Sequence, residues 1–98
     1  MTREQIIVQL AKNKAVLQSK FYLETIALFG SYARGENSEK SHIDLLVTFN
    51  NQTNDLYAVK SELQIYLHDL LKSEVDICNE KYIKPFYKKQ ILSEAIYV

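Results

Sequence analysis

Apolar residues recur at helical spacing near the start of the chain. The repeat is formed by Ile6, Ile7, Leu10, Ala11 and Leu17. Thr2 and Gln5 precede it with the spacing of a capping box, in which each side chain accepts a hydrogen bond from the other residue's backbone N–H. Because these signals agree, the pattern predicts a first helix over residues 3–19.

Three later segments have the patterns of strands. Residues 21–29 form a nearly continuous aromatic and aliphatic run that stops at Gly30, which is typical of a strand buried on both faces. Residues 42–49 alternate between two faces instead. One face carries Ile43, Leu45 and Val47, and the other carries His42, Asp44 and Leu46. A third, shorter strand is predicted over residues 74–78.

Further helices are predicted between and after these strands. Residues 31–34 are long enough for one helical turn, which Gly35 closes. Leucines at helical spacing predict a longer helix over residues 56–72. Pro85 suits the first turn of a last helix, where its missing N–H costs nothing. We expect that helix to turn five residues toward the core: Phe86, Ile91, Leu92, Ala95 and Ile96.

The resulting order is helix, strand, short helix, strand, helix, strand, helix. This order predicts an α/β (α+β) fold in which a small mixed sheet of about three strands packs against helices. The chain has 98 residues, which leaves no room for a second core. We therefore expect residues 1–98 to form a single domain.

Charge and cysteine content narrow the class of protein. Twelve Lys and Arg residues balance twelve Asp and Glu residues, which argues against an extended nucleic-acid surface. Cys78 is the single cysteine, so no internal disulfide can form. No apolar run reaches the roughly 20 residues that span a bilayer, and polar residues stand where a signal peptide would be apolar. We expect a cytoplasmic protein without a membrane anchor.

Gly30 and Ser31 are the first candidates for chemistry. They stand where a predicted strand ends and a helix begins, so free backbone N–H groups and the helix dipole face an incoming anion. The Ser31 hydroxyl offers a further donor to a phosphate oxygen. The simpler interpretation is a common turn with an N-cap serine, and the pair alone does not exclude it.

Two carboxylates on neighbouring strands are the second candidates. Period-two geometry places Asp44 on the same face as His42, and it places Asp76 on the face opposite Val75 and Ile77. If the two strands are adjacent, the carboxylates meet and repel each other unless a cation lies between them. Oxygen ligands of this kind suit Mg²⁺. Alternatively, Asp44 faces solvent or a backbone N–H, and Asp76 caps a loop.

Together these segments resemble a known family. Leu28-Phe29-Gly30-Ser31-Tyr32-Ala33-Arg34-Gly35, followed by Ser41-His42-Ile43-Asp44-Leu45-Leu46-Val47, is similar to the minimal nucleotidyltransferase domain of the DNA polymerase β superfamily. Glu74-Val75-Asp76-Ile77 resembles its third carboxylate strand, and residues 91–97 resemble its C-terminal helix. The resemblance extends over essentially the whole chain.

The resemblance implies transfer of a nucleotidyl group, AMP from ATP, onto a hydroxyl. Small members of the family act as antitoxins that modify a tyrosine of a HEPN-type toxin in a hetero-oligomer. It implies that Gly30 and Ser31 hold the triphosphate and that Arg34 supports it or the motif helix. It also implies that Asp44 and Asp76 bind Mg²⁺ and that Asp76 helps to activate the acceptor hydroxyl, with in-line displacement at the α-phosphate.

One residue departs from the family pattern. His42 stands where the family has the first aspartate of an Asp-x-Asp pair, and imidazole offers one nitrogen lone pair in place of two oxygens. We therefore expect weakened Mg²⁺ binding and slower transfer, with partial rescue by Mn²⁺. One alternative is an impaired relative that neutralises its partner by binding alone, with His42 at most a poor metal ligand. A small RNA-binding module that stacks bases on tyrosines is another, against which the neutral charge counts.

Overall fold

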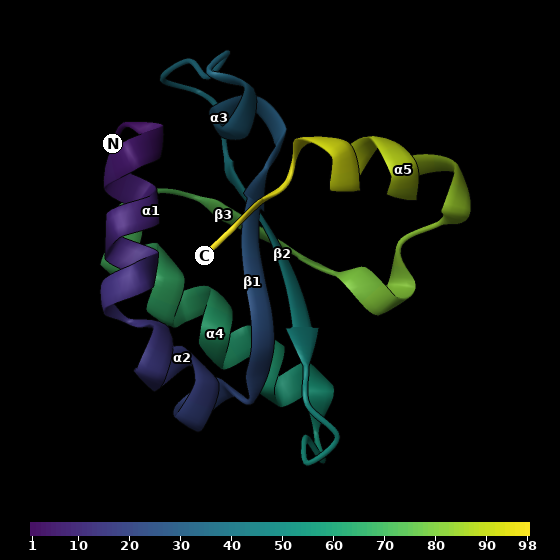
Figure 1. Ribbon diagram of the computed structural model, residues 1–98. Coiled ribbons are helices and arrows are strands. Elements are labelled where there is room, and N and C mark those ends of the chain that lie inside the picture. The colour runs from purple at the N-terminus through teal and green to yellow at the C-terminus, as the bar shows by residue number, and fades with distance from the viewer.

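The computed structural model describes all residues 1–98 and contains a four-stranded mixed sheet of order β3-β2-β1-β4 (Figure 1). β1 (Leu23–Phe29) and β2 (Ile43–Phe49) are antiparallel neighbours. β3 (Val75–Asn79) runs parallel to β2, and the two-residue β4 (Ile96–Tyr97) pairs antiparallel with β1. The predicted mixed α+β fold is confirmed, with four strands in place of about three.

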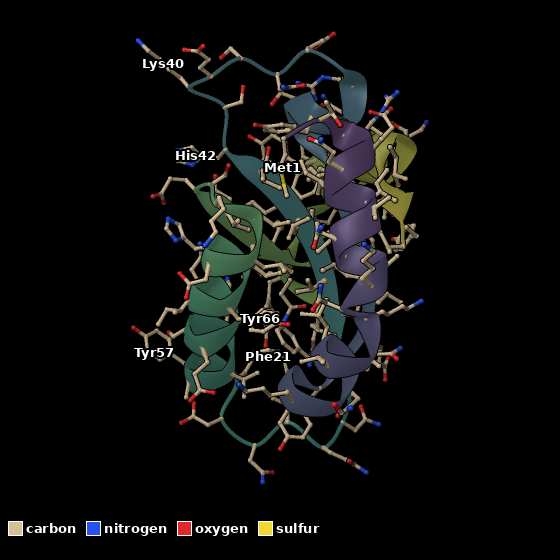
Figure 2. All side chains as sticks on the ribbon, turned by 90° about the vertical axis from the view of Figure 1, so that its left-hand side faces the viewer. Met1, Phe21, Lys40, His42, Tyr57 and Tyr66 are labelled. Carbon is tan, nitrogen blue, oxygen red and sulfur yellow. The ribbon has the colours of Figure 1, made fainter.

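Three helices cover one face of the sheet. They are α1 (Arg3–Lys12), α2 (Lys14–Phe21) and α4 (Leu56–Leu71), and Figure 2 shows them in front of the strands. Seventeen buried residues from these helices, α3 and the sheet form the hydrophobic core, including Phe21 and Leu67. None of the helices combines the length and the apolar character that crossing a bilayer requires.

The short helix α3 (Gly30–Arg34) follows β1 directly, as its sequence predicts. A 3-10 turn, η1 (Glu80–Tyr82), follows β3. α5 (Pro85–Glu94) then lies on the other side of the sheet from α1, α2 and α4 (Figure 1). Its C-terminal end returns to the sheet, because β4 follows within two residues and pairs with β1.

The single helix predicted over residues 3–19 is wrong, because the chain forms two helices that meet at Asn13. The Asn13 side chain donates to the Gln9 carbonyl at 2.8 Å and accepts from the Tyr66 hydroxyl at 3.0 Å. An asparagine that bonds nearby backbone competes with the helix, and here a hydroxyl from α4 also holds it. The capping box of Thr2 and Gln5 is present at the start of α1.

The predicted core face of the last helix is wrong at Phe86, and its other residues are only half-buried. No residue of α5 is buried, and Phe86 is 86% exposed. Ile91, Leu92 and Glu94, near the end of the helix that returns to the sheet, are half-buried. Ile96 belongs to β4 and packs against the core from there. The first turns of α5 lie away from the sheet, so their apolar side chains face solvent.

Candidate nucleotide and metal site

Asp44 and Asp76 lie directly opposite each other on neighbouring strands. β2 and β3 are parallel, and their register pairs Asp44 with Asp76. Residues paired across two strands point to the same face of the sheet, so the carboxylates share that face. The Asp44 side chain is half-buried, whereas the Asp76 side chain is 63% exposed. The site therefore has one inner and one outer carboxylate.

Gly30 packs against the inner carboxylate. Its φ of +76° lies in the left-handed region, which glycine adopts without steric cost. A Cβ atom added at Gly30 would overlap Asp44 Oδ2 and lie 3.0 Å from Asp44 Cγ. Glycine is thus required here both by the backbone and by the close approach of Asp44. The turn between β1 and α3 and the first carboxylate form one unit.

The first turn of α3 carries Ser31 beside this unit. Its N-cap residue is Phe29, whose side chain offers no hydrogen bond to the turn. The first N–H groups of a helix have no partner within the helix, and those that no other side chain binds are available to an anion. Ser31 is half-buried on α3. The structure brings Gly30, Ser31 and Asp44 to the same corner of the sheet.

Arg34 forms ion pairs within the protein. Its Nε lies 2.9 Å from Glu36 Oε2, and its Nη1 lies 3.0 Å from Glu94 Oε2. The hydrogen bonds to Glu36 and Glu94, in that order, raise the pKa of the Arg34 guanidinium. This arrangement ties the end of α3 to α5. Arg34 is 40% exposed, so part of the guanidinium also faces solvent.

Glu94 is a residue of the site that the sequence does not single out. Its second carboxylate oxygen, Oε1, accepts a hydrogen bond from the Gly30 N–H at 3.2 Å. Its partners are 60 and 64 residues away in the chain, so no local spacing signals the contact. The only sequence signal is that Glu94 falls within the segment that resembles the family's C-terminal helix.

His42 turns toward the outer carboxylate. Its Nδ1 lies 3.0 Å from Asp76 Oδ2, and the side chains are 51% and 63% exposed. An exposed pair of this kind contributes little to stability, about 0–1 kcal/mol. It does occupy an oxygen of Asp76 that a metal ion would otherwise use. Position 42, where the resemblance implies a carboxylate, therefore contacts Asp76 through an imidazole.

Burial, together with the neighbouring charges, raises the pKa of the Asp44 carboxyl. The largest cause is burial, followed by repulsion from Asp76, while His42 and Arg34 act in the opposite direction. Glu94 adds a smaller repulsion. A cation between Asp44 and Asp76 would relieve this repulsion.

The donor set fits one divalent cation. Carboxylate oxygens are the ligands that Mg²⁺ prefers, and Mg²⁺ completes its shell with water and substrate phosphates. No three His, Cys, Asp or Glu side chains gather closely enough to hold a metal ion without such additional ligands. Asp44 and Asp76 would therefore hold the ion jointly with a bound nucleotide.

The raised pKa of Asp44 predicts a stability change in Asp44→Asn. A carboxyl group whose pKa is raised on folding stabilises the fold below its ordinary value of 3.8, and this contribution is lost as pH rises through the raised pKa. Above that pKa, Asp44→Asn should be more stable than the wild type in metal-free buffer. The difference should shrink as pH falls toward 3.8. Urea unfolding across this pH range, with Asp69→Asn on α4 as control, measures it. Equal stability of Asp44→Asn and wild type at neutral pH would contradict the prediction.

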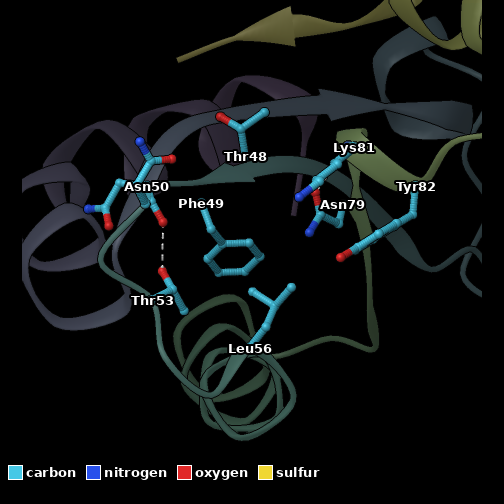
Figure 3. Close-up of a pocket in the computed structure, with 9 residues that line it drawn as sticks. Thr48, Phe49, Asn50, Thr53, Leu56, Asn79, Lys81 and Tyr82 are labelled. Carbon is cyan, nitrogen blue, oxygen red and sulfur yellow. Dashed lines mark hydrogen bonds between the residues drawn. The ribbon is translucent and has the colours of Figure 1, made fainter.

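A separate cleft lies at the other end of the sheet (Figure 3). It has a volume of about 310 Å³ and is lined by residues that include Phe49, Leu56, Asn79 and Tyr82. Asp44 precedes Phe49 by five positions on β2, which is roughly 16 Å along a strand. The cleft is therefore not part of the carboxylate site.

Comparisons with known proteins agree on one family. The family model for the nucleotidyltransferase domain matches residues 10–98. A predicted protein adenylyltransferase of Methanocaldococcus jannaschii is 41% identical over 98 residues, covering 99% of this chain and 98% of its own. Protein adenylyltransferase MntA of Thermococcus cleftensis is 37% identical over 98 residues, covering 100% of this chain and 97% of its own.

Solved structures share the fold. A minimal nucleotidyltransferase superposes with a TM-score of 0.78 at 35% identity, covering 98% of this chain and 95% of its own. A toxin-antitoxin structure with AMP-PNP superposes with a TM-score of 0.67 at 25% identity, covering 99% of this chain and 72% of its own. A third structure is that of an AMPylated HEPN toxin of Shewanella oneidensis in complex with an MNT antitoxin. It superposes with a TM-score of 0.59 at 24% identity, covering 91% of this chain and 69% of its own, and it shows the fold alone.

Proposed function

The chain belongs to the nucleotidyltransferase domain family, and from this we propose that it transfers AMP from ATP to a hydroxyl of a partner protein, as the antitoxin of a HEPN-type toxin. The placement of the two carboxylates beside the Gly30 turn supports this reaction. Asp44 and Asp76 lie opposite each other, and Asp44 packs against the Gly30 turn that begins α3. Cation ligands and an anion-binding turn thus stand side by side, as transfer from a metal-bound triphosphate requires.

Gly30 and Ser31 would hold the triphosphate: Gly30 lets the backbone approach it closely, and Ser31 offers its N–H and its hydroxyl. Asp44 and Asp76 would hold Mg²⁺, which supplies charge stabilisation at the transferring phosphate. We propose Mg²⁺ as the physiological ion, with Mn²⁺ as a substitute, because Mn²⁺ binds a mixed carboxylate and imidazole site more tightly.

Asp76 is suited to receive the proton of the acceptor hydroxyl. It is the outer carboxylate, 63% exposed, so a side chain from a partner can reach it. The acceptor oxygen forms a bond to the α-phosphorus while the bond to the leaving pyrophosphate breaks. The hydroxyl proton passes to the Asp76 carboxylate, whose Oδ2 lies 3.0 Å from His42 Nδ1. Asp44 is half-buried and packs against the Gly30 turn, so it would hold the cation close to the triphosphate.

A partner protein would supply the acceptor, which we propose to be a tyrosine. α5 has no buried residue, and its exposed Phe86 and Tyr87 lie among lysines. A ten-residue helix is only marginally stable without packing, so a partner surface on α5 would stabilise it. The related proteins named as protein adenylyltransferases and the toxin-antitoxin structures support a toxin as that partner, in a hetero-oligomer. Consumption of ATP would place this complex in the cytoplasm.

The contact between His42 and Asp76 favours a second candidate function. If His42 prevents the outer carboxylate from binding the cation, the chain retains the fold and the anion-binding turn but transfers AMP poorly. It would then neutralise its partner by binding alone. The two candidates differ in whether label from ATP reaches the partner.

Label transfer from [α-³²P]ATP to the partner tests the proposed function. With Mg²⁺ or Mn²⁺, the wild type should label the partner. Asp44→Asn or Asp76→Asn should reduce the rate by more than about 10–100-fold, which is the effect of losing a group that only orients a metal ligand. Asp69→Asn, an exposed carboxylate on α4, should match the wild type. Co-elution with the partner and thermal unfolding confirm that each variant binds and folds. Equal labelling by the wild type and both site variants would refute these roles, and binding without any label would favour the second candidate.

A further inference from the structure

Glu94 reaches both ends of α3 from the opposite end of the chain. Its Oε1 accepts from the N–H of Gly30, the first residue of α3, at 3.2 Å. Its Oε2 accepts from Nη1 of Arg34, the last residue of α3, at 3.0 Å. The Glu94 side chain is 16% exposed. One carboxylate, largely removed from water, therefore spans the whole motif helix.

The burial of Glu94 requires these two contacts. A carboxylate removed from water costs free energy unless hydrogen bonds or an opposite charge replace its hydration. Here a backbone N–H binds one oxygen and a guanidinium binds the other. Hydrogen bonds to charged groups are stronger than neutral ones, so the carboxylate fixes its partners firmly. Both partners belong to α3, so the two hydrogen bonds fix the Glu94 side chain relative to that helix.

α3 needs such support. It has five residues, fewer than an isolated helix needs to be stable in water. It begins at a glycine, which loses more backbone freedom on folding than any other residue. Its N-cap side chain gives no hydrogen bond to its first turn. The direction of the Gly30 and Ser31 N–H groups therefore depends on contacts from outside the helix.

We propose that Glu94 is a positioning residue for nucleotide binding: it holds Gly30 and Arg34 at the two ends of α3 and so aims the N–H and the hydroxyl of Ser31 at the phosphates. This inference rests on the proposed function, because it assumes that α3 receives the triphosphate. Glu94 does not contact the reacting atoms. It acts through the turn, and it leaves the Ser31 hydroxyl free for the ligand.

Glu94→Gln and Glu36→Gln form a matched pair of variants. Each removes one carboxylate partner of Arg34, but only Glu94 also binds Gly30. Glu36 is 66% exposed and lies two residues from Arg34, so its loss should change little, as for other exposed pairs. The probe is AMP-PNP with Mg²⁺, measured by calorimetry. We expect Glu94→Gln to weaken AMP-PNP binding on the order of tenfold, as outer supporting groups commonly do, and Glu36→Gln to bind like the wild type.

Steady-state transfer provides a readout that a purely structural role would not move. A misaimed α3 should raise KM for ATP more than it lowers kcat, because phosphate contacts are already made in the ground state. Glu94→Asp, which keeps the charge, should recover part of the affinity. Unchanged AMP-PNP affinity with a lower Tm would show that Glu94 only stabilises the fold, and this would overturn the proposal. Tighter binding would overturn it as well, because the carboxylate would then compete with phosphate.

Binding and transfer separate this inference from the proposed function. A wild type that binds AMP-PNP but labels no partner would refute the transferase role, and a weaker Glu94→Gln would still support the clamp. A wild type with no affinity for AMP-PNP would overturn both. Thermal unfolding of each variant shows whether a loss of binding reflects a loss of folded protein.

Discussion

Replacing His42 with aspartate is expected to raise the rate of AMP transfer about 10–100-fold, the range typical for groups that support a metal. The change restores a carboxylate beside Asp44 and releases Asp76 Oδ2 from the imidazole that now lies 3.0 Å away. Carboxylates offer two oxygens to a hard cation, whereas imidazole offers one nitrogen. His42→Asp should therefore bind Mg²⁺ more tightly, and the advantage of Mn²⁺ over Mg²⁺ should shrink.

The measurement is label transfer from [α-³²P]ATP to the partner, with Mg²⁺ and with Mn²⁺. His42→Asn is the matched control, because it frees Asp76 without adding a carboxylate. If both variants gain equally, release of Asp76 alone explains the effect and the missing ligand does not. If only His42→Asp labels the partner and the wild type does not, the result favours neutralisation of the partner by binding. No gain in either variant would show that His42 does not limit transfer.

The Tm of His42→Asp provides a check independent of transfer. A third carboxylate beside Asp44 and Asp76 increases repulsion in metal-free buffer, so the Tm should fall. Mg²⁺ should then raise the Tm more in His42→Asp than in the wild type, because a ligand stabilises the state that binds it. An equal Mg²⁺ effect on the two proteins would argue against a shared cation.

Gly30→Ala is expected to lower both the stability of the fold and the rate of transfer, although it adds only one methyl group. At φ +76° an alanine pays about 1–2 kcal/mol for the left-handed backbone. Its Cβ would also overlap Asp44 Oδ2, so the Asp44 carboxylate must move. A displaced ligand in a transfer site can cost about 100-fold in rate. Urea unfolding and label transfer measure the two effects.

Gly35→Ala separates backbone strain from the contact with Asp44. Gly35 has nearly the same φ, +74°, but an added Cβ would meet no atom within 4 Å. Both variants should lose stability from the backbone, and only Gly30→Ala should also lose transfer. If Gly35→Ala abolishes transfer to the same extent, strain in the turn is sufficient and the close approach of Asp44 has no special role.

Much of the site's placement follows from the sequence, because alternation is a local signal. It places Asp44 and Asp76 on defined faces of their strands, and the parallel register then sets them opposite each other. The capping box at Thr2 and the stop at Gly35 are local in the same sense. Such features depend on neighbours within a few positions, so the sequence alone predicts them.

The missed features depend on distant partners. The break at Asn13 involves the Tyr66 hydroxyl from α4, and the role of Glu94 involves Gly30, 64 residues earlier. β4 has two residues, too few for any period to show. The apolar pattern of α5 predicts burial, but its apolar side chains are exposed because the helix lies away from the sheet for most of its length. None of these is visible in a window of neighbouring residues.

The position of β3 at one edge of the sheet has a consequence for solubility. An edge strand presents unpaired backbone groups on which the strand of another molecule can assemble, and native proteins discourage this with short edges and charges. β3 has five residues, the Gln64 side chain binds its Val75 carbonyl, and Asp76 places a negative charge at its second position. The Asp76 carboxylate thus also disfavours aggregation through pairing of edge strands.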